Sequence, residues 1–208
     1  MKTPIPTLLL TLWSILVLLT VVIAIDIHNY QLRNCEGNFA RCNNIRPCHC
    51  CTVAHEPEGH PPDTPWEHDW VSSSYHDLDS SDQAGISTLW GKKYKLENGH
   101  HDPHEQVCLN LAHARSSFWF RNQRPHCRRE QACPWIVDGG DHLAVMDSAD
   151  AMNSTQCALC DEISIDNHLF KVNYDVSANV TAALMRVWNS GGGYDRIPEE
   201  IRLLEVKK

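Results

Sequence analysis

Short segments in which apolar and polar side chains alternate recur along the chain, and this two-residue period predicts β-strands. The clearest is residues 25–30, which follow an uncharged apolar run at residues 8–24. The other predicted strands lie at residues 70–75, on both sides of a turn near Gly91, at 135–137 and 142–146 around the sequence DGGD, and at 162–165 and 169–176 around Asp166, Asn167 and His168. Turn-forming residues between apolar segments are typical of hairpins, so most of these strands should pair with a neighbour in sequence.

Two stretches instead place apolar side chains three or four residues apart, which is the spacing of an amphipathic helix. In residues 105–121 these positions are Val107, Leu111, Ala114 and Phe118. In residues 177–189 they are Val180, Leu184, Val187 and Trp188, and the glycines that follow end the helix. A shorter helix is expected after Pro198. The predicted fold class is therefore α+β: a disulfide-stapled domain of mostly antiparallel β-hairpins with about two helices.

The amino terminus has the pattern of a secretory signal peptide. One basic residue, Lys2, precedes the apolar run, and Val22 and Ala24 stand at positions −3 and −1 of a cleavage site after Ala24. The alternative is an uncleaved membrane anchor, for which the run is at the short end of what spans a bilayer. We predict that residues 1–24 are the signal peptide and that residues 25–208 form a single disulfide-rich domain. Both alternatives place residues 25–208 on the oxidising side of the membrane.

All ten cysteines lie in this exported part, and five of them fall within residues 34–52. Exported thiols are oxidised to disulfides, which disfavours a zinc site or a free redox pair built from Cys48, Cys50, Cys157 and Cys160. We predict that all ten cysteines form disulfides: Cys35, Cys42, Cys48, Cys50, Cys51, Cys108, Cys127, Cys133, Cys157 and Cys160.

The pairing pattern does not follow from the sequence, but the neighbours Cys50 and Cys51 constrain it. Successive side chains on a strand point to opposite faces, so these two should have different partners, one local and one in the body of the domain. The further expectations are a bond within the first cluster by Cys35 or Cys42, and bonds from Cys157 and Cys160 to earlier cysteines.

Two sequons, at Asn153 and Asn179, predict N-glycosylation of an exported chain. On the predicted helix, Asn179 lies opposite the apolar stripe, where a glycan would not disturb the core. The formal net charge is −8, and it becomes more negative when Lys2 leaves with the signal peptide. Such a chain is repelled by phosphate backbones, which excludes nucleic acid as a partner. The expected partner is an unidentified extracellular protein or glycan, with no membrane contact beyond the export signal.

The sequence of residues 25–51, "IDIHNYQLRNCEGNFARCNNIRPCHCC", resembles the amino-terminal pattern of small, cysteine-rich secreted proteins of filamentous fungi. The matching positions are Cys35, Gly37, Cys42, Asn44, Ile45, Pro47, Cys50 and Cys51, and Cys48 is an addition to the pattern. The resemblance implies an extracellular, disulfide-bonded, effector-like or cell-surface protein, a class usually without known enzymatic activity.

Thirteen histidines raise the question of a metal site. The densest group combines His100, His101 and His104 with Asp102 and Glu105, residue types that bind copper or zinc. The turn-forming residues around this group favour a polar loop instead, so we assign no metal to it.

A second resemblance is to fungal UstYa-like oxidases, which have an amino-terminal apolar segment and carry the motif H-x-x-H-C twice. In "HEQVCLN", Val107 stands where the second histidine belongs, directly before Cys108. In "QRPHC", Gln123 stands where the first histidine belongs, before His126 and Cys127. Both motifs are incomplete, and each departure removes a ligand that the resemblance implies. A membrane-anchored, metal-dependent oxidase-like protein is therefore the alternative function.

The chain contains no Gly-x-Ser-x-Gly elbow, so we assign no catalytic residue and no cofactor. The predicted function is that of a secreted, disulfide-rich, N-glycosylated protein of non-enzymatic binding or effector type.

Overall fold

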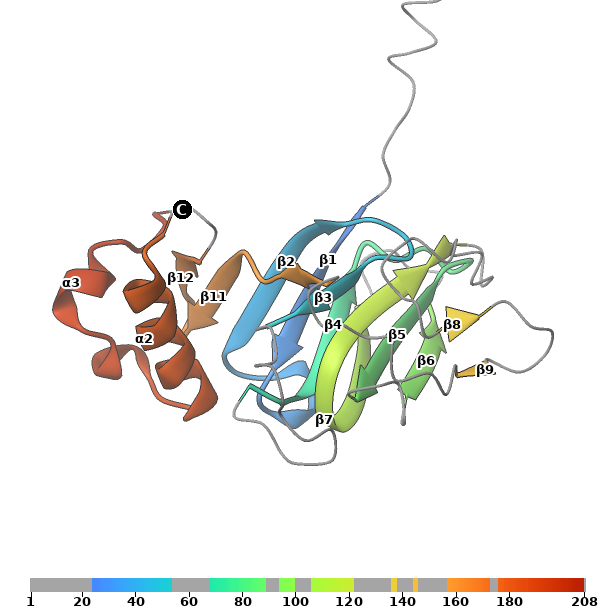
Figure 1. Ribbon diagram of the computed structural model, residues 1–208, viewed down its shortest axis with the longest axis horizontal. Coiled ribbons are helices and arrows are strands. Elements are labelled where there is room, and N and C mark those ends of the chain that lie inside the picture. Colours follow the sequence, from blue (N-terminus) through green and yellow to red (C-terminus); the bar gives the residue numbers. More distant parts are fainter. Residues whose placement is uncertain are drawn as a thin grey trace, which may run out of the picture.

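The computed structural model describes residues 24–53, 68–88, 94–99, 106–121, 136–137, 144–145, 157–172 and 176–207. Within these residues ten strands form one sheet in the order β10-β3-β7-β4-β1-β2-β11-β12, with β5 beside β7 and β6 beside β5 (Figure 1). The strands of this sheet are β1 (Ile25–Tyr30), β2 (Phe39–Ile45), β3 (Cys50–Thr52), β4 (Trp70–His76), β5 (Gln83–Thr88), β6 (Tyr94–Asn98), β7 (Val107–Phe120), β10 (Ala158–Leu159), β11 (Glu162–Ile165) and β12 (His168–Lys171). Its pairs are antiparallel except β10 with β3.

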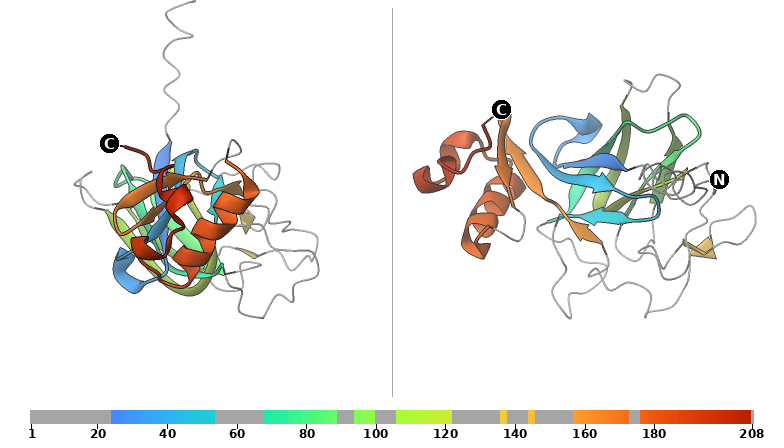
Figure 2. Two further views of the ribbon diagram at one scale, coloured as in Figure 1. Left: turned by 90° about the vertical axis from the view of Figure 1, so that its left-hand side faces the viewer. Right: turned by 90° about the horizontal axis from the view of Figure 1, so that it is seen from above.

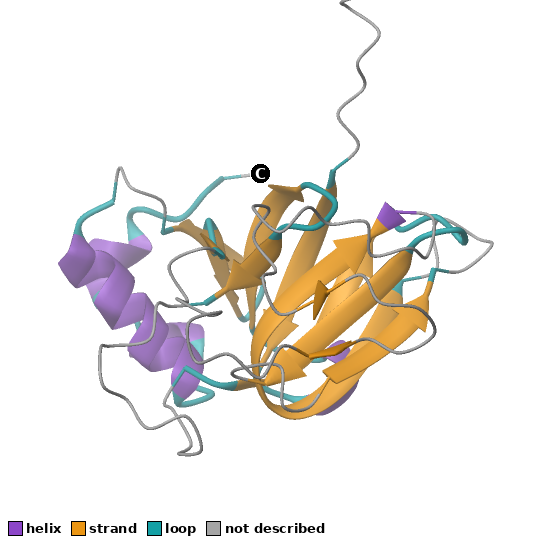
Figure 3. Cartoon of the chain, turned by 45° about the vertical axis from the view of Figure 1, so that its right-hand side comes forward, coloured by secondary structure: helices purple, strands orange, loops and turns teal. Residues whose placement is uncertain are grey.

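The predicted α+β class is wrong, because the chain is mainly one large, mostly antiparallel sheet. The two expected helical segments near the carboxyl terminus are present as α2 (Ala178–Asn189) and α3 (Glu199–Arg202). They lie at one end of the molecule beside β11 and β12 (Figure 1) and do not form a second layer over the sheet (Figure 3). The expected strands at residues 25–30 and 70–75 are confirmed, as are the β5–β6 hairpin and the pair of β8 (Ile136–Val137) with β9 (Ala144–Val145).

Strand β7 accounts for most of this error, because residues 105–121 were predicted to be a helix. The 14-residue strand pairs with β4 along its first half and with β5 and β3 along its second half. Its register shifts once opposite β4 and once opposite β5. Extra residues in β7 at these bulges break the two-residue alternation that marks a strand, so the buried Val107, Ala114 and Phe118 fall seven and four residues apart, as on a helix. Pairing with three strands distant in sequence then overrides the local pattern.

The sheet curls so that its concave side encloses the core (Figure 2). Ile27 of β1 and Tyr75 of β4 are fully buried there, together with Trp119 of β7. Two side-chain bonds join strands that do not pair: the Trp119 indole N–H donates to the Ile45 carbonyl at 2.8 Å, and the Tyr75 hydroxyl donates to the Gly85 carbonyl. These bonds satisfy the polar atoms of large aromatic side chains inside the core.

Gly85 marks a close approach between β5 and β7. It lies opposite Phe118, and a Cβ at Gly85 would be 2.1 Å from Cε2 of that fully buried ring. We expect Gly85→Ala to lower the free energy of unfolding by about 3 kcal/mol, because a packed ring must move. Urea unfolding would measure this. In a Phe118→Leu background, Gly85→Ala should cost less stability than it does in the unaltered protein, because the smaller side chain leaves room for the new methyl group. Equal costs in the two backgrounds would contradict the steric explanation.

The carboxyl-terminal elements begin with the predicted hairpin of β11 and β12. Its two turn residues, Asp166 and Asn167, have φ of 50° and 66°, as a type I′ turn requires. Helix α2 follows, where the Ser177 side chain accepts a hydrogen bond from the Val180 N–H as N-cap. Gly191, with φ of 62°, ends the helix. The helix buries Leu184, Met185, Val187 and Trp188, in agreement with the predicted stripe.

No helix within the described part of the chain is long and apolar enough to cross a membrane. The apolar run predicted to be the signal peptide lies outside the described residues, except for Ala24.

Candidate functional site

Three disulfides connect the described parts of the chain. Cys35, in the 3-10 turn η1 (Arg33–Cys35), is bonded to Cys108 of β7. Cys42 of β2 is bonded to Cys51 of β3 across the core, nine residues apart in sequence. Cys50 of β3 is bonded to Cys157, 107 residues further along the chain. Each bond therefore joins two segments that are separated in the sequence, by 9 to 107 residues.

The neighbouring cysteines behave as predicted. Cys51 has the local partner, Cys42, and Cys50 has the distant one, Cys157. The expected bond within the first cluster is made by Cys42, whereas Cys35 reaches β7. Cys48 is also disulfide-bonded.

Cys160 differs from the prediction that all ten cysteines are paired. It is the free thiol among the described cysteines and is 5% exposed. Its Sγ lies 3.6 Å from the Val53 carbonyl oxygen, which accepts a hydrogen bond from the thiol. Burial, and to a lesser extent the charge of Asp161, raises the pKa of the Cys160 thiol to about 12. Such a group stays protonated at neutral pH and is a poor nucleophile, so a redox role at Cys157 and Cys160 has no support.

Several predicted sites fall outside the described residues. These are Cys127 and Cys133, the sequon at Asn153, and the histidine-rich group at residues 100–105. The second sequon is described: Asn179 is exposed in the first turn of α2, on the face opposite the buried side chains.

The convex side of the sheet carries a group of polar and aromatic side chains that the sequence analysis did not single out. In β1, Ile25 and Ile27 belong to the core, and the alternating residues Asp26, His28 and Tyr30 face the other side. Register places Ser74 and Arg41 on either side of His28. We call His28, Tyr30, Phe39, Ser74 and His76 the outer-face cluster.

Aromatic contacts hold the outer-face cluster together. The rings of His28 and Phe39 are stacked, with centroids 4.3 Å apart and planes 3° apart. The His76 ring lies against His28 at 4.2 Å, and Tyr30 packs on Phe39 at 5.5 Å. His28 is only 9% exposed, although it is on the side of the sheet away from the core. The cluster is thus a small, second packed region.

A chain of hydrogen bonds joins four side chains of the cluster. It links His76 Nε2 to Ser74 Oγ (3.1 Å), Ser74 Oγ to the Tyr30 hydroxyl (3.2 Å), and that hydroxyl to His28 Nδ1 (3.4 Å). Three bonds need three protons, and the two hydroxyls supply at most two of them. At least one of the two inward imidazole nitrogens must therefore be protonated. The outward nitrogen of that neutral ring is then a bare acceptor.

Burial keeps both imidazoles neutral. It lowers the pKa of His28 from 6.5 to about 3, assisted by the neighbouring His76 and Arg41. The pKa of His76 is also lowered, chiefly by burial, and the carboxylates of Asp26 and Asp77 oppose this shift. Burial raises the pKa of Tyr30, so its hydroxyl keeps its proton. At neutral pH the outer-face cluster carries no charge.

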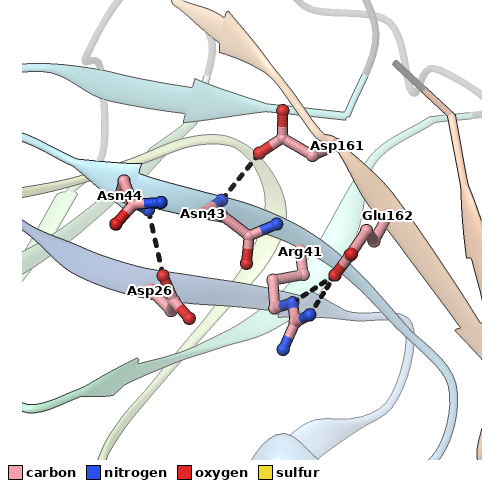
Figure 4. A network of polar contacts seen from close by, with 6 residues as sticks. All are labelled: Asp26, Arg41, Asn43, Asn44, Asp161 and Glu162. Atoms are coloured by element: carbon pink, nitrogen blue, oxygen red, sulfur yellow. Dashed lines mark hydrogen bonds and ion pairs between the residues drawn. The ribbon is translucent and has the colours of Figure 1, made fainter. Parts of the chain in front are cut away.

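Charged groups form a network of polar contacts on β1, β2 and the start of β11 (Figure 4). Arg41 donates from Nε to Glu162 Oε2 at 2.7 Å and contacts the same oxygen through Nη2. Asp161 accepts the Asn43 backbone N–H at 2.7 Å, and Asp26 accepts the Asn44 backbone N–H at 2.9 Å. Each of these carboxylates makes its contact through one oxygen, and the other oxygen can accept a hydrogen bond from a ligand.

Among the described residues, no group of three or more histidine, cysteine, aspartate or glutamate side chains is arranged to hold a metal ion. What this part of the sheet offers is a set of fixed hydrogen-bonding groups beside an aromatic ring, which is suited to binding.

The comparisons with known proteins place the chain in a family. Residues 26–164 match the sequence profile of a family described as an "N-terminal domain", a fungal domain of unknown function. The chain belongs to this family. No curated protein and no solved structure matches the chain.

The family domain runs from β1 to within β11, so it contains the three described disulfides and the whole outer-face cluster. Strand β12 and helices α2 and α3 follow it. The fungal assignment agrees with the resemblance found at residues 25–51, but the description names neither effector-like proteins nor UstYa-like oxidases.

The outer-face cluster could have been found only in part from the sequence. The alternation in residues 25–30 already places His28 and Tyr30 on one side of a strand. Ser74 and His76, however, join them through the antiparallel register of β1 with β4, a pairing across more than 40 residues. The histidine count drew attention to residues 100–104 because histidines are dense there.

Proposed function

We propose that this protein is secreted after cleavage of residues 1–24, is N-glycosylated, and acts outside the cell as a non-enzymatic binding protein of effector or cell-surface type. The observation that carries the proposal is the disulfide pairing of cysteines in the central strands. Cys42, Cys50 and Cys51 are each at most 1% exposed and bonded. Stable bonds of this kind form in oxidising compartments and are rare in the cytosol.

The exposure of Asn179 supports glycosylation. Its side chain projects from the solvent face of α2, while Leu184 and Trp188 of the same helix are fully buried. A glycan on Asn179 would therefore extend into solvent without displacing core residues.

The oxidase-like alternative receives no comparable support. Val107, which stands in place of the second histidine of the first motif, is fully buried in the core, where an imidazole would have to give up its hydration. The cysteine of the same motif, Cys108, is bonded to Cys35. Both residues of this motif thus stabilise the fold, Val107 through core packing and Cys108 through its disulfide.

Expression of the full chain in a fungal secretory host tests the proposal. We expect the protein in the medium, with Ile25 as its first residue and a mass that falls on enzymatic removal of N-glycans. Native material should not react with an alkylating reagent, and denaturation without reduction should expose Cys160. Retention in the membrane fraction with residues 1–24 attached, or ready alkylation of Cys42, Cys50 or Cys51 in the native protein, would contradict it. Bound copper or zinc in stoichiometric amount would favour the oxidase-like alternative.

A further inference from the structure

The side chains on the convex side of the sheet lie in rows set by strand register. One row crosses five strands through Ser74, His28, Arg41, Glu162 and Lys171, each opposite the next. With neighbouring strands about 4.8 Å apart, this row is roughly 19 Å long. Phe39 lies in the adjacent row, between Tyr30 and Ser164. An extended ligand could therefore contact several of these positions at once.

Phe39 provides a flat apolar surface in the middle of this region. One face of its ring is covered by the stacked imidazole of His28, which is itself held against His76. Phe39 is partly exposed, so solvent reaches parts of the ring that His28 does not cover. A ring fixed in this way can stack on the apolar C–H face of a sugar, and no rotamer freedom needs to be lost on binding.

The polar groups along β1, β2 and the start of β11 offer both donors and acceptors. Asp26 and Asp161 each use one carboxylate oxygen for a backbone N–H. At least one outward nitrogen of His28 and His76 is a bare acceptor, as the proton count requires, and the Arg41 guanidinium supplies N–H donors. Hydroxyl groups, which donate and accept together, match such a mixed set better than groups that only accept or only donate.

The charges argue against an ionic ligand. Along the row, Glu162 lies between Arg41 and Lys171, so positive and negative charges alternate. Arg41 is already paired with Glu162, and the two histidines are neutral. Asp26 and Asp161 would repel a polyanion, while Arg41 and Lys171 would repel a polycation.

We propose that the outer-face cluster, together with Asp26, Arg41, Asp161 and Glu162 further along the sheet, binds a neutral saccharide. The site deepens the proposed function, since it depends on the protein meeting glycans outside the cell. Phe39 would stack on one sugar ring, and the carboxylates and imidazoles would bind hydroxyl groups elsewhere along the saccharide.

Titration calorimetry of the secreted protein with three neutral oligosaccharides, chitohexaose, laminarihexaose and mannohexaose, tests this inference. We expect saturable binding of at least one. Phe39→Leu keeps an apolar cover over His28 but removes the flat ring, and it should weaken binding about tenfold, the contribution of one aromatic contact. Phe39→Trp should retain binding. The control is Leu203→Ala, a truncation of an 82%-exposed apolar side chain after α3, which should leave affinity unchanged.

Thermal unfolding of each variant separates lost binding from lost folding. The inference fails if none of the three oligosaccharides binds, if folded Phe39→Leu binds as tightly as the unaltered protein, or if an oligogalacturonate, which is anionic, binds in place of the neutral sugars. If the protein is exported with its cysteines paired but fails these tests, the saccharide site alone is refuted. If export or pairing fails, the proposed function falls, whatever the sugars do.

Discussion

Lowering the pH from 7 to 3 is expected to reduce the free energy of unfolding by on the order of 5 kcal/mol through His28 alone, since each pKa unit corresponds to about 1.4 kcal/mol. Burial holds the pKa of His28 at about 3 in the folded protein, against 6.5 for an exposed histidine. Below pH 6.5 the unfolded chain therefore takes up a proton that the folded protein refuses. The contribution of His28 to the free energy of unfolding is fully present above pH 6.5 and is lost as the pH falls toward 3.

The groups facing His28 modify this decline. His76, whose pKa is also lowered, acts in the same direction, and the positive charge of Arg41 adds to the penalty for protonating either ring. The carboxylates of Asp26 and Asp77 favour protonation of His76 and so reduce its share. Together, the losses at His28 and His76 are a large part of the free energy of unfolding of a typical domain, which is about 5–15 kcal/mol.

Urea unfolding at pH 7, 5.5 and 4 would measure the effect, with His28→Gln as the decisive variant. The glutamine cannot be charged, so its stability should depend less on pH even if its stability at pH 7 is lower. The matched control is His113→Asn, which replaces a histidine whose side chain is 65% exposed; asparagine tolerates the φ of 59° found there. An unchanged pH dependence in His28→Gln, or a flattened one in His113→Asn, would contradict the assignment.

Removing the Cys50–Cys157 bond by Cys50→Ala/Cys157→Ala is expected to cost about 4 kcal/mol. The two residues are 107 apart, but the Cys35–Cys108 and Cys42–Cys51 bonds shorten the path between them in the unfolded chain. The bond then closes a loop of at most roughly 60 residues, for which the chain-entropy model gives about this value. It also holds Cys157 beside the two-residue strand β10, which is too short to pair stably by itself.

Non-reducing urea unfolding of three variants would test the order of effects. Cys42→Ala/Cys51→Ala opens a loop of nine residues and should cost about 3 kcal/mol. Cys160→Ala removes a buried thiol that closes no loop, and it should cost about 1 kcal/mol. If Cys160→Ala lowered the free energy of unfolding as much as Cys50→Ala/Cys157→Ala does, this would indicate that Cys160 forms a disulfide in the native protein.

The disulfides and the outer-face cluster belong to one sheet. The disulfide of Cys42 and Cys51 lies in the core, whereas His28 and Phe39 form a packed region on the convex side. A sheet cross-linked in this way can keep a nearly buried, uncharged imidazole pair in place without a second layer of secondary structure. That rigidity is what the proposed saccharide site requires, because prearranged groups lose little entropy on binding.

The sequence by itself determined the features that depend on neighbours along the chain. It predicted β1 from alternation, the β11–β12 hairpin from its turn residues, and α2 from its apolar stripe, Ser177 and the glycines. It also predicted that Cys50 and Cys51 have different partners, since that follows from strand geometry alone.

Only the tertiary structure decided the rest. Residues 105–121 have helical spacing, but three strands far away in sequence pair with β7 and make it extended. Cys108 meets Cys35, and His76 meets His28, because β4 lies between β7 and β1. Sheet register between distant strands depends on the sum of many contacts and on the bulges between them, so no short window of sequence contains it.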